Sequence, residues 1–107
     1  MIATGDLGEL GHAIVKEQLE NIGLDLKEKY IDCGMEIYDR ITQDVHAGGS
    51  GCGCCASVFA GHIYSLLKTG KINRVLLVAT GALMSTTSSF QGQSIPGVAH
   101  AVAIERV

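Results

Sequence analysis

Hydrophobic side chains recur along the chain in patterns that predict alternating strands and helices. Residues 1–4 are short and apolar. Residues 7–22 then carry apolar side chains at helical spacing, with acidic and basic side chains between them. Asp6 can cap this helix with Glu9 three residues later, and Gly23 can end it. We therefore predict a short strand followed by an amphipathic helix.

The middle of the chain predicts a second strand–helix pair. Residues 30–38 alternate weakly and indicate one or two short strands. Residues 41–53 form a predicted loop with glycines at positions 48, 49, 51 and 53. Residues 54–67 predict a helix that has no strongly polar face, so we expect it to be buried on all sides. His62 lies mid-helix among apolar residues and is interpreted as a packed core histidine.

The last third predicts two strands and completes an α/β fold. Residues 74–79 are a continuous β-branched and apolar run, as in the centre of a parallel sheet. Residues 82–97 form a polar loop, and residues 98–104 form the last strand. The order β-α-β-α-β-β predicts an α/β fold with a mixed, mostly parallel sheet and a buried central helix. The glycine-rich loop then follows a strand end, where open α/β sheets bind ligands.

Composition and charge indicate that this pattern is part of a larger core. The 107 residues allow one domain, residues 1–107. The first 44 positions hold ten acidic and four basic residues, whereas residues 45–67 and 75–104 hold no charged residue. A small free-standing domain exposes most of its surface to water, so long stretches without a charged side chain are not expected in it. We expect a fragment of a double-layered protein that self-associates through exposed apolar surface, with a compact three-layer domain as the alternative.

Several classes of protein are excluded or disfavoured by the sequence. The net charge of −3 argues against nucleic acid as a partner, and no apolar run approaches the ~20 residues of a membrane span. The N-terminus does not resemble a signal peptide. The clustered cysteines favour a reduced, intracellular setting, and their spacing is not that of a zinc knuckle. We expect no metal site and no cofactor. The cysteines are Cys33, Cys52, Cys54 and Cys55.

Five short motifs occur in the order found in a known family. The most specific is the loop at residues 43–54, and the others are Thr4-Gly5-Asp6-Leu7-Gly8, Asp32-Cys33-Gly34, Ala79-Thr80-Gly81-Ala82-Leu83-Met84-Ser85 and Ser94-Ile95-Pro96-Gly97-Val98-Ala99-His100-Ala101-Val102. Over essentially its whole length the chain resembles the stage V sporulation protein AD family. That family has a thiolase-like fold, of which this chain resembles the C-terminal half.

The resemblance implies a function in sporulation. The family belongs to the apparatus that moves dipicolinic acid into the forming bacterial spore. The implied role is a non-catalytic component that binds dipicolinic acid, free or as its calcium chelate. The implied location is the forespore or spore, peripheral at the inner spore membrane. Expected partners are other dipicolinate-transport proteins, together with a second copy or a missing N-terminal half.

The resemblance also indicates that the condensing chemistry of thiolase-like enzymes is lost. The catalytic cysteine of those enzymes comes from the N-terminal half. In those enzymes one position of the C-terminal half holds a His or Asn, and a later position holds a Cys. In this chain the first position falls at Gly5 and the later one at Thr80–Gly81. Either His46 or Cys52 occupies the remaining loop position, and one residue alone is not a general acid–base catalyst. The alternatives are one half of an acyl-transfer or thiolase-like enzyme, or an assembly module that docks a partner.

The expected ligand-binding residues come from two loops. His46 could hydrogen-bond a carboxylate, or be satisfied by backbone. Backbone N–H groups before the residue 54–67 helix favour an anion, although the glycines there could serve only for tight packing. The first loop contributes His46, Gly48, Gly49, Ser50, Gly51 and Cys52, and the second contributes Met84 and Ser85.

Overall fold

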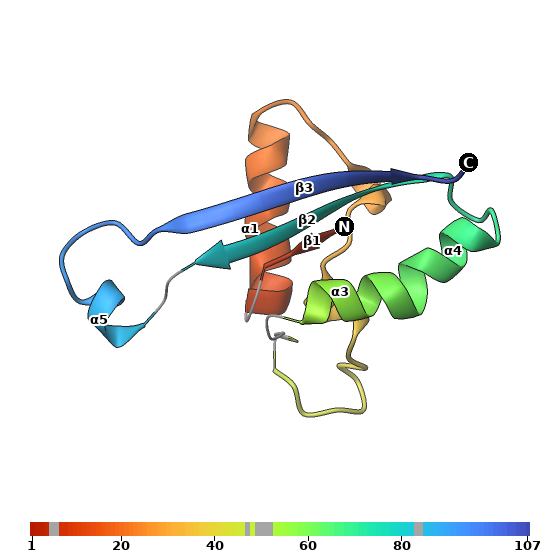
Figure 1. The fold of residues 1–107 in the computed structure, drawn as a ribbon. Coiled ribbons are helices and arrows are strands. Elements are labelled where there is room, and N and C mark those ends of the chain that lie inside the picture. Colours follow the sequence, from red (N-terminus) through yellow and green to blue (C-terminus); the bar gives the residue numbers. More distant parts are fainter. Residues whose placement is uncertain (5–6, 47, 49–52, 83–84) are drawn as a thin grey trace.

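A three-stranded sheet organises the chain. The computed structural model describes residues 1–4, 7–46, 48, 53–82 and 85–107. The strands are β1 (Ile2–Ala3), β2 (Arg74–Ala82) and β3 (Gly97–Glu105), in the spatial order β1-β2-β3 (Figure 1). The predicted strands at residues 1–4, 74–79 and 98–104 are therefore confirmed, although β2 continues three residues beyond its expected end.

The prediction of a mostly parallel sheet is wrong. β1 pairs with β2 in parallel over two residues, whereas β2 pairs with β3 in antiparallel register from Arg74↔Glu105 to Ala82↔Gly97. The physical reason lies in the connection between β2 and β3. Its short helix α5 (Thr86–Ser89) lies at the far end of the two strands rather than across a face of the sheet, so the chain turns back on itself (Figure 1).

The two long predicted helices are confirmed. Helix α1 spans Gly8–Asn21 and ends before Gly23, whose φ of +86° is readily adopted by glycine. The second helix is a continuous run of α3 (Cys54–Val58), the π-turn η3 (Phe59–Ile63) and α4 (Tyr64–Lys68). We call it the central helix run. Asp6, the expected cap of α1, lies outside the described residues.

The segment at residues 30–38 is not a strand. A short 3₁₀ turn η2 (Lys27–Lys29) precedes it, and Cys33–Glu36 forms the one-turn helix α2. Only Asp32 makes a strand-like bridge, in parallel with Ile2. The reason is local capping, because the Asp32 side chain accepts a hydrogen bond from the Gly34 N–H and so starts a helical turn.

The central helix run is buried on one side, not on all sides. Its inner side contributes five buried core residues, which pack with partly buried side chains of the sheet; these residues are Cys54, Cys55, Val58, Ile63, Leu67, Val75, Leu77 and Ile104. Its outer side is exposed at Ala60, Ser65 and Tyr64. One small sheet covers one side of a helix, and no other described segment covers the opposite side.

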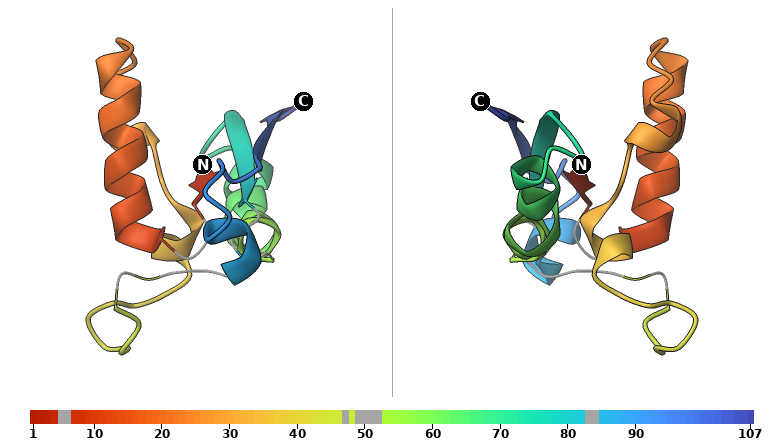
Figure 2. Two further views of the ribbon diagram at one scale, coloured as in Figure 1. Left: turned by 90° about the vertical axis from the view of Figure 1, so that its left-hand side faces the viewer. Right: turned by 90° about the vertical axis from the view of Figure 1, so that its right-hand side faces the viewer.

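The molecule is elongated as a result. Its dimensions are 48 × 35 × 22 Å and its radius of gyration is 14.9 Å, above the ~13 Å typical of a compact domain of this size. The β2–β3 hairpin extends past the central helix run towards α5, and α1 stands apart from both (Figures 1 and 2). Leu76 and Val102 are more than half exposed, which fits the expected exposed apolar surface. None of the described helices is long and apolar enough to cross a membrane.

Candidate functional site

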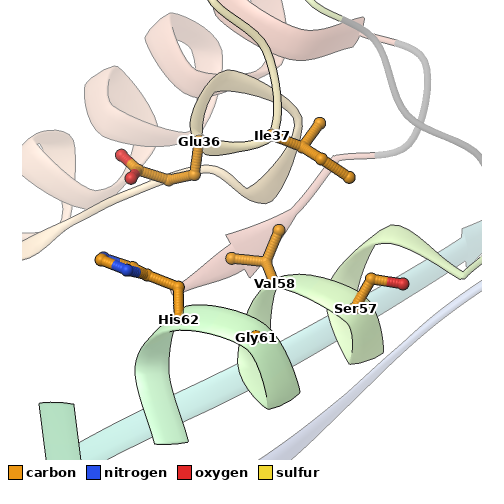
Figure 3. A pocket seen from close by; sticks show the side chains of 6 residues that line it. All are labelled: Glu36, Ile37, Ser57, Val58, Gly61 and His62. Carbon is orange, nitrogen blue, oxygen red and sulfur yellow. The ribbon is translucent and has the colours of Figure 1, made fainter. Parts of the chain in front are cut away.

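A pocket of about 250 Å³ lies between α2 and the central helix run. Glu36 and Ile37 form one wall, and Ser57, Val58, Gly61 and His62 form the other. Figure 3 shows the Glu36 and His62 side chains extending to the same end of the pocket from opposite walls, with Val58 between the walls and Ser57 at the other end. The pocket therefore places a carboxylate, an imidazole and a hydroxyl around an apolar floor.

The π-turn positions the helix wall of this pocket. In η3 the Tyr64 N–H donates to the Phe59 carbonyl, five residues back, instead of the usual four. Gly61 and His62 lie within this widened turn, and both are exposed. A Cβ placed on Gly61 would contact nothing within 4 Å, so the wall is open at this point. π-turns of this kind occur frequently at functional sites.

Asp32 positions the opposite wall. Its carboxylate is 1% exposed and accepts hydrogen bonds from the Gly34 N–H at 2.9 Å, the Thr4 N–H at 3.1 Å and the Thr4 hydroxyl at 2.8 Å. These bonds join the end of β1 to the start of α2. Because α2 is only one turn long, its direction, and hence the position of Glu36, depends on this anchor.

The polar groups of the pocket suit binding. Glu36 and His62 are exposed, so their side chains can reorient towards a ligand, whereas Val58 is 6% exposed and fixed in the core. The imidazole can donate to an anionic group or accept from a donor, and the carboxylate can accept or bind a cation. Together they can recognise a small planar molecule that places polar groups at one end and an apolar ring over Val58.

Three cysteines lie buried beside this site and do not line the pocket. Cys33, Cys54 and Cys55 are free thiols with exposed fractions of 8% or less. Burial, together with the neighbouring Cys55 and Cys54, raises the pKa of Cys33 to about 12. A thiol with so high a pKa is a poor nucleophile and metal ligand at neutral pH. Among the described residues, no group of three or more His, Cys, Asp or Glu could hold a metal ion.

The expected loop residues are only partly described. His46 is exposed, has a φ of +49°, and its Nδ1 lies 4.0 Å from the Asp44 carboxylate. Gly48 is buried with a φ of +75°, and a Cβ there would lie 3.2 Å from the Gly34 carbonyl and 3.1 Å from the Arg40 side chain. Gly48 therefore serves close packing of the loop on α2. Gly49, Ser50, Gly51 and Cys52 lie outside the described residues.

The second loop that was expected to bind a ligand does not lie beside the first. The Ser85 hydroxyl accepts from the Ser88 N–H at 3.2 Å and lies 2.9 Å from the Ser88 hydroxyl, so it caps α5. Helix α5 lies at the far end of the β2–β3 hairpin, away from the loop at residues 37–46 (Figure 1). Met84 lies outside the described residues. Among the described residues, Ser85 and His46 therefore belong to separate places.

Sequence reasoning missed the pocket for two identifiable reasons. Glu36 fell in a segment interpreted as a strand, and His62 was interpreted as a core histidine, whereas the structure exposes it on the widened turn. His100 is likewise exposed, on β3. Asp32 was the available signal for α2, because an Asp side chain can accept a hydrogen bond from the backbone N–H two residues later and so start a turn.

Comparisons with known proteins agree on one family. A family model described as stage V sporulation protein AD matches residues 1–105. The stage V sporulation protein AD of Bacillus subtilis (strain 168) is 49% identical over 106 residues, which cover 99% of this chain and 31% of that protein. The chain thus spans less than a third of the length of this curated relative.

Proposed function

Because the chain belongs to the stage V sporulation protein AD family, we propose that it acts in bacterial sporulation as a non-catalytic component that binds dipicolinic acid. The observation that carries the proposal is the family match across residues 1–105. Dipicolinic acid as the ligand, transport into the spore, and a peripheral place at the inner spore membrane come from the family resemblance. The proposed partners are other proteins of the same transport apparatus.

The chemistry of the ligand agrees with the residues available. Dipicolinate is a flat pyridine ring that carries a carboxylate on each side of the ring nitrogen. Such a dianion is bound by N–H donors at its edge and by apolar contact with its ring. His46 is available as one donor, since its side chain is 94% exposed. His62, opposite Glu36 over the buried Val58, is a second donor next to an apolar floor.

Glu36 favours the calcium chelate over the free dianion at the pocket. A carboxylate repels a free dicarboxylate but ligates calcium, which takes six to eight oxygen ligands. Dipicolinate supplies only part of that set. We therefore propose that this pocket prefers the calcium chelate, whereas the loop around His46 takes the free dianion.

The non-catalytic part of the proposal rests on the sequence. By the thiolase-like resemblance, Gly5 and Thr80–Gly81 stand where condensing enzymes place a His or Asn and a Cys. The remaining loop position, His46 or Cys52, cannot by itself transfer both protons that an acyl transfer requires. Acyl-CoA turnover that is lost in His46→Ala or Cys52→Ser would contradict this part and favour a thiolase-like enzyme.

Titration calorimetry tests the binding proposal. Without calcium, dipicolinate binding should weaken at least tenfold in His46→Ala, and with excess calcium its binding should weaken at least tenfold in His62→Ala. Pyridine-3,5-dicarboxylate, which cannot chelate calcium through its ring nitrogen, is the matched ligand control for the measurement with calcium, and His100→Ala is the matched protein control. Equal binding of both ligands in the presence of calcium, or no binding of dipicolinate under either condition, would overturn the proposal.

A further inference from the structure

β3 forms an outer edge of the sheet. The strand order is β1-β2-β3, and β3 pairs with β2 along all nine of its residues. On its other side, no described residue pairs with β3. A strand in this position presents a row of backbone N–H and C=O groups with no partner strand.

The register identifies which residues present these groups. The Arg106 N–H donates to the Asn73 carbonyl at 2.9 Å, one position beyond the Arg74↔Glu105 pair. Hydrogen-bonded pairs alternate along an antiparallel ladder. The even-numbered residues of β3 therefore bond to β2, and the odd-numbered residues Ala99, Ala101 and Ala103 direct their backbone groups outward.

β3 lacks the features that usually protect an edge strand from pairing with another strand. Natural edge strands are protected by lysines, prolines, bulges or short length. β3 is nine residues long, its register with β2 is continuous, and it has no charged residue before Glu105 and no proline inside it. Eight of its nine residues are exposed, and Ile104 is partly buried. The edge is thus long, regular and open.

The edge is also complementary to itself. If two copies of β3 pair in antiparallel about a twofold axis at Ala101, Ala99 lies opposite Ala103 and Gly97 lies opposite Glu105. On the other face Val98 lies opposite Ile104 and His100 lies opposite Val102. The central pairs then bring alanine opposite alanine on one face and mostly apolar side chains together on the other, and no two like charges are opposed. The outward backbone N–H and C=O groups at positions 99, 101 and 103 all find hydrogen-bond partners on the second copy, as a closed twofold interface requires.

We propose that a second copy of this chain pairs with β3 in antiparallel about Ala101, which joins the two three-stranded sheets into one. The inference goes beyond the proposed function and does not depend on it. The occupant is a second copy because the same nine residues meet the geometric and charge requirements of both partners.

The first test measures mass by light scattering across protein concentrations. The chain should shift from monomer to dimer as concentration rises. Ala101→Pro removes the outward N–H at the axis but no bond to β2, and should weaken dimerisation at least tenfold. Ala101→Ser keeps that N–H and is the matched control. Circular dichroism checks that both variants keep the fold. A monomer at every concentration would overturn the proposal.

The second test needs no variant and locates the contact. Amide hydrogen exchange, measured residue by residue in dilute and concentrated samples, should slow with concentration at Ala99, Ala101 and Ala103. The amides of His100 and Val102 bond to β2 and should be protected at both concentrations. A dimer without concentration-dependent protection of the odd-numbered amides would place the contact elsewhere. Protection of these amides in the monomer would assign the edge to a segment of the same chain. Either result overturns the proposal.

Discussion

The Thr4 hydroxyl donates a hydrogen bond of 2.8 Å to the Asp32 carboxylate, 28 residues away in the sequence. The same carboxylate also accepts from the backbone N–H groups of Thr4 and Gly34. One nearly inaccessible side chain thus ties the end of β1 to the start of α2. Since α2 carries Glu36, the anchor also determines the position of one pocket wall.

Asp32→Ala should lower the free energy of unfolding by about 3 kcal/mol, because hydrogen bonds to a buried charged group are strong and three donors would lose their acceptor. Urea denaturation followed by circular dichroism measures the change. Asp39→Ala is the control, because Asp39 accepts similar local bonds from Ile41 and Thr42 but is exposed. An equal loss in both variants would show that burial of Asp32 is unimportant.

Gly11→Ala should destabilise the chain even though alanine favours helices. A Cβ at position 11 would lie 2.5 Å from the Thr4 Cβ and 2.9 Å from the Leu7 Cβ, so α1 would have to move away from β1. Overpacking of this kind costs about 1–3 kcal/mol.

Gly61→Ala is the matched substitution in the other helix. Nothing lies within 4 Å of its Cβ position, so we expect a gain of up to about 1 kcal/mol from helix propensity alone. Thermal denaturation of both variants measures the difference. If Gly61→Ala also destabilised the chain, space would not be what distinguishes the two glycines.

Tyr30→Phe should leave stability unchanged or raise it by up to about 1 kcal/mol. The Tyr30 ring stacks on His12 with centroids 4.4 Å apart, but its buried hydroxyl has no hydrogen-bond partner among the described residues. Phenylalanine keeps the stack and removes an unsatisfied polar group. Tyr30→Leu, which loses the stack, should be destabilising. A loss in Tyr30→Phe as large as in Tyr30→Leu would mean that the hydroxyl is bonded.

Stability should fall at alkaline pH. Burial raises the pKa of Cys33 from 9.0 and that of Tyr30 from 10.0, each to about 12. The unfolded chain therefore loses these protons first, so their contribution is complete below pH 9 and is lost as the pH rises from 9 towards 12. Urea midpoints at pH 8, 9, 10 and 11 measure the fall. The fall of the urea midpoint with pH should be smaller in Tyr30→Phe. A midpoint that does not change with pH would contradict the expectation.

The buried thiols should resist alkylation. Cys33 is 0% exposed, and with a pKa of about 12 only about one molecule in ten thousand carries its thiolate at pH 8. Iodoacetamide should therefore leave Cys33 unmodified in the folded chain and modify it fully in concentrated urea. Mass spectrometry of peptides measures both. Rapid modification in the folded state would show that the site opens readily.

The pattern of residues was sufficient for the long regular elements. The spacing of apolar residues in α1, the uniform run of residues 54–67 and the β-branched run of β2 each predicted the observed type of element. The type of element is predictable in such segments because many consecutive residues favour the same secondary structure. The segment at residues 30–38 failed for the opposite reason. There a single capping contact at Asp32 outweighed a weak alternation.

The candidate site depended on contacts that no local pattern contains. The loop residues expected to bind a ligand divide between a packing glycine at Gly48, an exposed His46 and a helix cap at Ser85. The pocket instead joins Glu36 with His62, which are 26 positions apart. Their convergence requires both the Asp32 anchor and the widened turn in the central helix run.

By itself, the sequence determined the family, the two long helices, the apolar strands and the presence of apolar surface that one small domain cannot cover. Only the tertiary structure decided the direction of β3, which side of the central helix run is buried, and where that apolar surface lies. Hydrophobic periodicity indicates how much of each helix or strand is buried. It does not record which element provides the burial, because that depends on contacts between residues far apart in the chain.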